Sequence, residues 1–221
     1  MPAKPTLTIL AGVNGAGKSS IGGQALRDLG AAYFNPDEHA RLLRAKLPAL
    51  TQEKANALSW AYGVAKLEEA MVTGADFTFE STLGGKTITN LLIQAAQKNH
   101  QLMIWFVGLA SVELHLKRVA QRVAKGGHPI PEADIRKRWI GSRENIIRLI
   151  PFVTTLRVFD NSAEFAARGT PEPTLLLSIE ESELTYPDPV ELRDTPTWAK
   201  PIIAGAYKHF GLLSSIRPKA V

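Results

Sequence analysis

The chain has 221 residues, of which 45% are hydrophobic, enough for one substantial α/β domain with a buried core. It contains no cysteine, which excludes a disulfide framework, a thiol nucleophile and a cysteine zinc site. Lys and Arg number 26 against 21 Asp and Glu, and this modest excess of +5 suits either nucleic acid or a site for several phosphate groups. No apolar run approaches the roughly 18 residues that cross a bilayer, and residues 1–5 do not resemble a signal peptide. We therefore expect a cytoplasmic protein without a membrane partner.

The first expected strand, residues 6–11, is followed by a phosphate-binding motif. Residues 12–19 read Gly-Val-Asn-Gly-Ala-Gly-Lys-Ser and fill every fixed position of the P-loop pattern G-x-x-x-x-G-K-[ST]. In that pattern backbone N–H groups cradle phosphate oxygens, Lys18 reaches the β- and γ-phosphates, and the Ser19 hydroxyl ligates Mg²⁺. An expected helix over 19–29 completes the strand–loop–helix context. The sequence therefore predicts binding of ATP or GTP with Mg²⁺ through Gly12, Asn14, Gly15, Ala16, Gly17, Lys18, Ser19 and Ser20.

A second feature, Asn35-Pro36-Asp37-Glu38, lies between a short expected strand at 31–35 and an expected helix at about 38–45. Ligands of doubly wound sheets bind at the carboxyl ends of the strands, which would place Asp37 beside the P-loop. There its carboxylate could take the proton of an acceptor hydroxyl or support Mg²⁺ through water. The alternative is that Asp37 only caps the helix.

The next helix is expected from Thr51, a suitable N-cap, to Gly74. It leads to a strand at 76–80 that ends in Glu80. A carboxylate at the end of an apolar strand is costly unless it is paired or hydrated. Because hydroxyl side chains follow it, we assign Glu80 and Thr82 to binding of an acceptor such as a polyol or sugar. The alternative is that Ser81 and Thr82 cap the helix expected at 86–98.

The most strand-like run, residues 102–109, ends in Gly108-Leu109 without an acidic side chain. Motor and oligomeric ATPases use an acid at that strand end to hold metal and activate water. Its absence argues against that class. It favours a small kinase in which the carboxylate on the acceptor side comes from another strand.

Basic residues gather in the helices expected at 111–125 and 132–149. The Gly126-Gly127 pair between them makes 122–138 a candidate mobile lid, in which arginines would close over the transferring phosphoryl group. The alternative is a solvated, charged helix face. The candidates are Arg118, Arg122 and Arg136 for catalysis, and His128 and Arg138 for the acceptor.

A strand at 155–159 precedes Asp160-Asn161-Ser162, where Asn161 is a candidate contact to the nucleotide and a simple turn is the alternative. Residues 170–221 form a less regular tail, with an expected edge strand at 173–179 and a final helix at 200–213. We expect the tryptophans to pack in the core, with stacking of Trp139 on a base as an alternative. They are Trp60, Trp105, Trp139 and Trp198.

Strands and helices alternate along the chain, which predicts an α/β fold of the P-loop kinase type. We expect three layers, with a mostly parallel sheet of five to six strands and helices on both faces. No domain boundary, internal repeat or nucleic-acid-binding motif is evident. Residues 1–221 are therefore expected to form a single domain that does not bind nucleic acid.

Four motifs in this order resemble the zeta toxin family over about residues 5–162. They are 14–19 in the P-loop, Asn35-Pro36-Asp37-Glu38, Phe79-Glu80-Ser81-Thr82, and 126–131 followed by Arg136 and Arg138. The resemblance implies a kinase that phosphorylates the 3′-hydroxyl of UDP-N-acetylglucosamine or a related UDP-sugar, and an antitoxin as protein partner.

The same resemblance implies roles for individual residues. Asp37 would be the base on the sugar hydroxyl, and Glu80 with Thr82 would hold the sugar nucleotide. Lys18 and arginines of the lid would stabilise the phosphoryl group. Two alternatives stay open: a kinase of another small acceptor (a nucleoside, an antibiotic or a sugar), and a nucleotide-dependent regulatory protein without transfer.

Overall fold

A computed structural model describes residues 3–19, 22, 33–163 and 172–213. Ser20, most of the helix expected at 19–29, the start of the strand expected at 31–35 and part of the tail lie outside these residues. In chain order the elements are β1 (Thr6–Ala11), α2 (Pro36–Lys46), α3 (Gln52–Thr73), β2 (Phe77–Ser81), α4 (Lys86–Gln97), β3 (Gln101–Gly108), α5 (Val112–Ala124), α6 (Glu132–Leu149), the 3-10 turn η1 (Ile150–Phe152), β4 (Thr155–Asp160), β5 (Thr174–Glu180), β6 (Glu183–Tyr186), the 3-10 turn η2 (Glu191–Asp194) and α7 (Lys200–His209).

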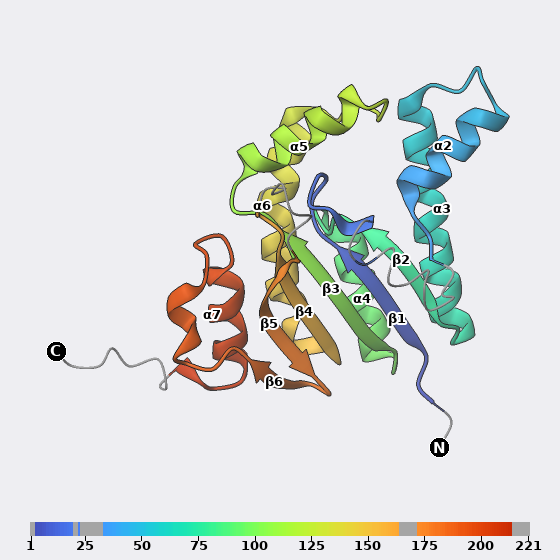
Figure 1. Ribbon diagram of the computed structural model, residues 1–221. Coiled ribbons are helices and arrows are strands. Elements are labelled where there is room, and N and C mark those ends of the chain that lie inside the picture. The colour runs from blue at the N-terminus through green and yellow to red at the C-terminus, as the bar shows by residue number, and fades with distance from the viewer. Residues whose placement is uncertain (1–2, 20–21, 23–32, 164–171, 214–221) are drawn as a thin grey trace.

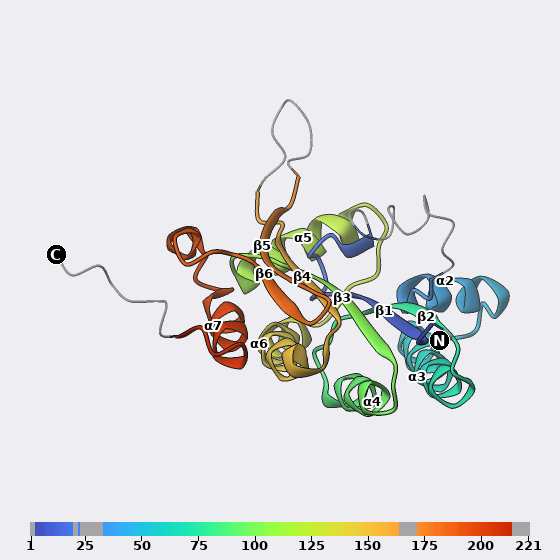
Figure 2. The ribbon, with the colours of Figure 1, turned by 90° about the horizontal axis from the view of Figure 1, so that it is seen from below.

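One sheet organises the described residues, with the strand order β2-β1-β3-β4-β5-β6. The first four strands in that order are parallel, and β5 and β6 are antiparallel additions. Helices α4, α6 and α7 pack along one face of the sheet, while α5 lies beyond its opposite side (Figures 1 and 2). This is the mostly parallel α/β fold that the sequence predicts.

The core lies between the sheet and the helices. Its strands contribute near-continuous apolar runs because parallel strands are covered on both faces. Leu7 and Ile9 of β1, Ile104 of β3 and Val158 of β4 are fully buried there. Within the described part of the chain, no helix is both long and apolar enough to span a membrane.

The structure changes the expectation at the start of α2. The helix begins at Pro36, and Asn35 is its N-cap, since Asn35 Oδ1 accepts hydrogen bonds from the N–H groups of Asp37 and Glu38. The alternative that Asp37 caps this helix is therefore wrong, and its carboxylate belongs to the first turn. Of the strand expected at 31–35, the described residues form a single bridge between Phe34 and Phe79.

The expectation of an edge strand at 173–179 is also wrong. That segment forms β5, but β6 pairs with it on the far side and takes the edge. The two strands are joined at Glu181 and Ser182, which both adopt positive φ angles of 51° and 64°. A tight turn without glycine gives no sequence signal, so the second strand of this hairpin was missed.

Candidate active site

The P-loop lies at the carboxyl end of β1 and depends on glycine at two close approaches. Gly12 has φ 140°, and a Cβ there would collide with the carbonyl oxygen of Val107. Gly15 has φ 83°, and a Cβ there would lie 2.9 Å from the carbonyl oxygen of His115. The loop can therefore lie directly against β3 and α5, with its backbone free to turn toward a phosphate group.

Side chains from three other elements brace the P-loop. His115 of α5 lies with Nδ1 2.9 Å from the carbonyl oxygen of Asn14. Asn161, after β4, donates from Nδ2 to the carbonyl oxygen of Ala16 at 2.8 Å. Arg138 of α6 donates from Nη1 to Asn14 Oδ1, also at 2.8 Å. The loop is thus fixed in position before it meets any ligand.

His115 is a residue that sequence reasoning missed. It is 1% exposed, and burial, with help from the nearby charges of Lys18 and Arg118, lowers its pKa to about 4. The ring is therefore neutral at neutral pH and donates its Nδ1 proton to the Asn14 carbonyl. A histidine among the apolar residues of the helix expected at 111–125 was the available signal.

Glu80, which the sequence assigned to the acceptor, also contacts the P-loop. Parallel pairing of β1 with β2 sets Glu80 beside Leu10. One carboxylate oxygen lies 3.3 Å from Lys18 Nζ, and the other accepts a hydrogen bond from Ser19 Oγ at 3.0 Å. That second oxygen also accepts from Asn35 Nδ2 at 3.0 Å. Glu80 thus joins the end of β2 to the Lys and Ser of the motif.

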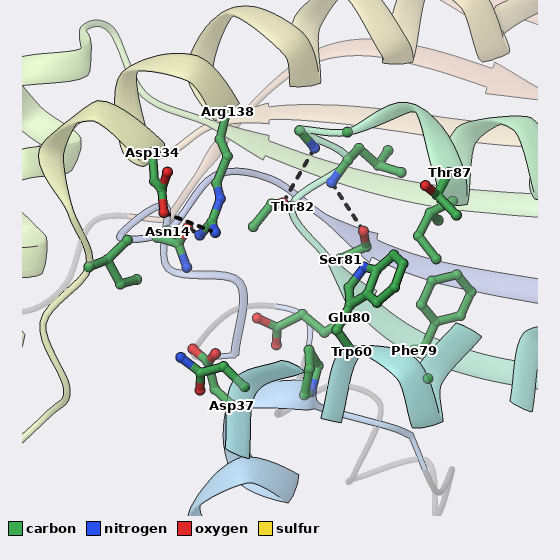
Figure 3. Close-up of a pocket in the computed structure, with 18 of the residues that line it drawn as sticks. Asn14, Asp37, Trp60, Phe79, Glu80, Ser81, Thr82, Thr87, Asp134 and Arg138 are labelled. Atoms are coloured by element: carbon green, nitrogen blue, oxygen red, sulfur yellow. Dashed lines mark hydrogen bonds and ion pairs between the residues drawn. The ribbon is translucent and has the colours of Figure 1, made fainter. Parts of the chain in front are cut away.

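A cavity of about 460 Å³ opens beside this cluster. It lies between α3, the loop from β2 to α4, the connection from α5 to α6, and the first turns of α6. Figure 3 shows Asn14, Asp37 and Arg138 toward one end, and Trp60, Phe79 and Thr87 toward the other. Of the acceptor-side residues predicted from sequence, Asp37, Glu80, Thr82, His128 and Arg138 all line this cavity.

Asp37, which lines the cavity, contacts two side chains from the segment around the end of α5. Its carboxylate lies 3.6 Å from Arg122 Nη1 of α5 and 3.9 Å from His128 Nε2 of the following connection. Arg122 also donates from Nη2 to the carbonyl oxygen of His128 at 3.3 Å. These contacts bring the segment after α5 across the cavity to α2.

The four candidate arginines divide between two kinds of position. Arg138 lines the cavity and contacts Asn14, and Arg122 contacts Asp37. Arg118 instead donates to the carbonyl oxygen of Ala163, after β4. The guanidinium of Arg136 pairs with Glu132 at 2.7 Å and with Glu113 at 3.1 Å, and thereby connects α6 to α5.

Asn145 of α6 is a second residue that the sequence did not single out. It is 4% exposed, and its Nδ2 donates to the carbonyl oxygens of Leu83 at 2.7 Å and Gly85 at 3.0 Å. Glycines allow the same close approach, because a Cβ on Gly141 would lie 2.5 Å from the carbonyl oxygen of Gly84. The wall of the cavity formed by the β2–α4 loop is thus fastened to α6.

The described residues contain no group of three or more acidic or histidine side chains arranged to hold a metal ion. The hydroxyl of Ser19 and the carboxylate of Glu80 nevertheless place two oxygen donors side by side. Oxygen donors of this kind suit Mg²⁺ when phosphate oxygens complete its coordination. The donor set therefore fits a magnesium ion carried in with a nucleotide.

Comparison with solved structures supports the fold. A chain from the crystal structure of AvrRxo1-ORF1:-ORF2 with ATP superposes with a TM-score of 0.61, at 18% identity over 94% of this chain and 77% of that one. A chain from the PezAT chromosomal toxin-antitoxin system of Streptococcus pneumoniae gives a TM-score of 0.52, at 12% identity over 96% of this chain and 88% of that one.

Sequence comparison finds an uncharacterised protein of Haemophilus influenzae that is 27% identical over 128 residues, 58% of this chain and 88% of that protein. The model of the family described as zeta toxin matches residues 1–167. This span contains the P-loop, Asp37, Glu80, Arg122 and Arg138, and it is most of the chain. The chain therefore belongs to the zeta toxin family.

Proposed function

We propose that this protein is an ATP-dependent kinase that transfers the γ-phosphoryl group to a hydroxyl of a small molecule. The observation that carries the proposal is the position of Asp37, which lines the same cavity as Asn14 of the P-loop and Glu80, the partner of Lys18. A donor site for a triphosphate and a base for a hydroxyl thus share one cavity. Membership of the zeta toxin family supports this reading.

On the donor side, the P-loop backbone cradles the phosphates, and the ammonium group of Lys18 stabilises the charge on the transferring group. Arg138 is held over the loop by Asn14, and Arg122 reaches in from α5. Their guanidinium groups neutralise charge that develops on the equatorial oxygens. When bound, Mg²⁺ supplies further charge neutralisation at the phosphates, with Ser19 and Glu80 as its protein-side holders.

On the acceptor side, the substrate hydroxyl oxygen forms a bond to the γ-phosphorus while the bond from that phosphorus to the bridging oxygen of ADP breaks. ADP leaves, and the hydroxyl proton passes to the carboxylate of Asp37. Arg122 and His128 lie within 4 Å of that carboxylate and hold it toward the cavity.

For the acceptor, we take a UDP-sugar such as UDP-N-acetylglucosamine as the first candidate, on the strength of the family resemblance. A nucleoside, an antibiotic or another sugar is the alternative. A protein partner of the antitoxin kind is part of the proposal, because a structural neighbour comes from a toxin-antitoxin system. The cytoplasmic location and the single domain with a lid at 122–138 remain predictions.

The test is to incubate the protein with Mg-ATP and a metabolite extract and to identify phosphorylated products by mass spectrometry. Asp37→Asn is the matched variant, since it keeps the size of the side chain but cannot accept the proton. We expect product with the wild-type protein, none with the variant, and nearly unchanged ATP binding in both. Full activity of Asp37→Asn would refute the assigned base. ATP turnover that no acceptor stimulates would favour the regulatory reading.

A further inference from the structure

Trp60 of α3 departs from the expectation that every tryptophan packs in the core. Its side chain is 53% exposed, yet it lines the cavity beside the P-loop. One face of α3 lines that cavity, since its lining residues are spaced by about one helical turn. They are Asn56, Trp60, Gly63 and Val64. A large apolar side chain left open on the wall of a pocket is an informative exposure.

The surface around Trp60 is aromatic and firmly supported. Phe34 and Phe79 line the same cavity, and Phe77 stacks between them, with ring centroids 6.5 Å from Phe34 and 5.2 Å from Phe79. A Cβ on Gly63 would lie 2.6 Å from Cε1 of Phe34, so the ring fits only because position 63 is glycine. The apolar end is therefore a rigid, preformed wall.

The two ends of the cavity differ in chemistry. Asp37, Glu80 and Arg138 bring charge to the end near the P-loop, whereas Trp60 and Phe79 lie toward the other end, together with Thr87 (Figure 3). A free sugar or polyol placed at the apolar end would lose water from several hydroxyls and find few partners for them beside the Thr87 hydroxyl. A planar unsaturated ring loses little on leaving water and gains stacking on an indole face.

We propose that this apolar end is a ring-binding subsite, in which Trp60 stacks on a planar unsaturated ring of the acceptor while the reacting hydroxyl lies at Asp37. The proposal rests on the kinase function proposed above and makes Trp60 a specificity-determining residue. The ring is a nucleobase or an aromatic group, because both offer the π face that the indole requires. The volume of about 460 Å³ lies in the range of about 300–1,000 Å³ that holds ligands larger than a fragment.

The experiment uses two pairs of probes that share their hydroxyls and differ in the ring. Uridine is compared with ribose, and phenyl β-glucoside with glucose, by titration calorimetry in the presence of Mg²⁺ and saturating non-hydrolysable ATP analogue. We expect the ring-bearing member of at least one pair to bind about tenfold more tightly or better. Preference for uridine identifies a nucleobase as the ring, and preference for the phenyl glucoside identifies an aromatic group.

Trp60→Ala should remove this preference, and Trp60→Phe should keep most of it because a phenyl ring still stacks. Leu58→Ala is the matched control, since Leu58 is 51% exposed on the same helix and is not among the cavity-lining residues. Equal binding of ring and ringless probes to the wild-type protein would overturn the subsite, as would an unchanged preference in Trp60→Ala. Binding needs no transfer, so Trp60-dependent binding in this experiment, together with no phosphorylated product in the metabolite-extract assay with Mg-ATP, would refute the kinase and leave the subsite intact.

Discussion

Lys18 and Glu80 form an ion pair between the P-loop and the neighbouring strand β2, with 3.3 Å between Nζ and Oε1. The two side chains are only 7% and 10% exposed, so the pair is shielded from solvent. Because Glu80 also accepts from Ser19, one carboxylate contacts both functional side chains of the motif. The end of β2 thereby supplies the acidic side chain of the phosphate site. The end of β3 supplies none, because it is occupied by Gly108.

Replacing Glu80 with Gln removes the charge that faces Lys18 and weakens the oxygen donor beside Ser19. We expect kcat/KM for Mg-ATP to fall about ten- to a hundredfold, the usual effect of losing an outer partner of a metal or phosphate site. Steady-state kinetics with varied ATP and Mg²⁺ measure this. Glu180→Gln is the control, since Glu180 pairs with Arg157 on the surface and should leave the kinetics unchanged. Normal kinetics for Glu80→Gln would contradict the role.

Arg138 and Arg136 provide a comparison within one turn of α6. Arg138→Ala removes a guanidinium that contacts Asn14, and we expect kcat to fall about a hundredfold or more with little change in ATP affinity. Arg136→Ala should leave kcat almost unchanged, because that guanidinium is engaged by Glu113 and Glu132. Equal losses in the two variants would refute the division of the arginines.

His115 makes stability depend on pH. Its pKa is about 4 in the folded protein and about 6.5 when unfolded, so between these values the unfolded chain binds more protons. The free energy of unfolding should therefore fall as the pH drops from about 6.5 to about 4, by about 3 kcal/mol from this residue. Urea unfolding across that range, compared with His115→Gln, isolates the contribution. Parallel pH profiles for the two proteins would show that His115 is not the cause.

Gly108 makes room for Trp198, which is buried against the end of β3. A Cβ at position 108 would collide with the indole ring, so Gly108→Ala should destabilise the fold by about 1–3 kcal/mol. Thermal unfolding measures the loss. Gly85→Ala is the control, because a Cβ there meets no atom within 4 Å. Adding Trp198→Phe to Gly108→Ala should recover part of the stability, and a failure to do so would place the strain elsewhere.

Asn145→Ala removes two hydrogen bonds to the loop that walls the cavity. We expect a loss of about 2 kcal/mol in the free energy of unfolding, because the buried carbonyl group of Leu83 loses its donor and that of Gly85 keeps only Thr89 Oγ1 as a side-chain donor. We also expect a higher KM for the acceptor with an unchanged Kd for ATP, since the loop borders the acceptor cavity. Asn90→Ala is the control: Asn90 accepts from Arg148 in the same network but does not contact the loop. An equal rise in the ATP constant would point to general loosening.

Much of this architecture could be predicted from local sequence signals. The helix expected at 132–149 has the bounds of α6, and Thr51 and Gly74 cap α3 as expected. In α3 a hydroxyl cap and a left-handed glycine fix the two ends, and α6 begins directly after Pro131. The P-loop could also be predicted locally, because its motif and the strand and helix expected around it are contiguous in sequence.

What could not be predicted depends on contacts between distant segments. Glu80 contacts Lys18 because β2 lies next to β1, and no local pattern gives that strand order. Arg136 and Arg138 lie on different faces of the helix because they are two residues apart, but only the path of α6 decides which of them meets the P-loop. The sequence predicts Trp60 to be a core residue, because an apolar residue at helical spacing does not reveal whether it faces a cavity or packed side chains.

The fastening of α6 has a consequence for how the site would open. Asn145 and the Gly84–Gly141 approach hold the middle of α6 to the β2–α4 loop, and Arg138 is tied to the P-loop. Within the described residues, Arg122 and His128 contact Asp37 and each other, and these contacts reach neither the P-loop nor the β2–α4 loop. We therefore expect the cavity to open on one side. The side formed by α6, with Arg138, stays fixed, and the acceptor enters when the short connection between α5 and Glu132 moves away from Asp37.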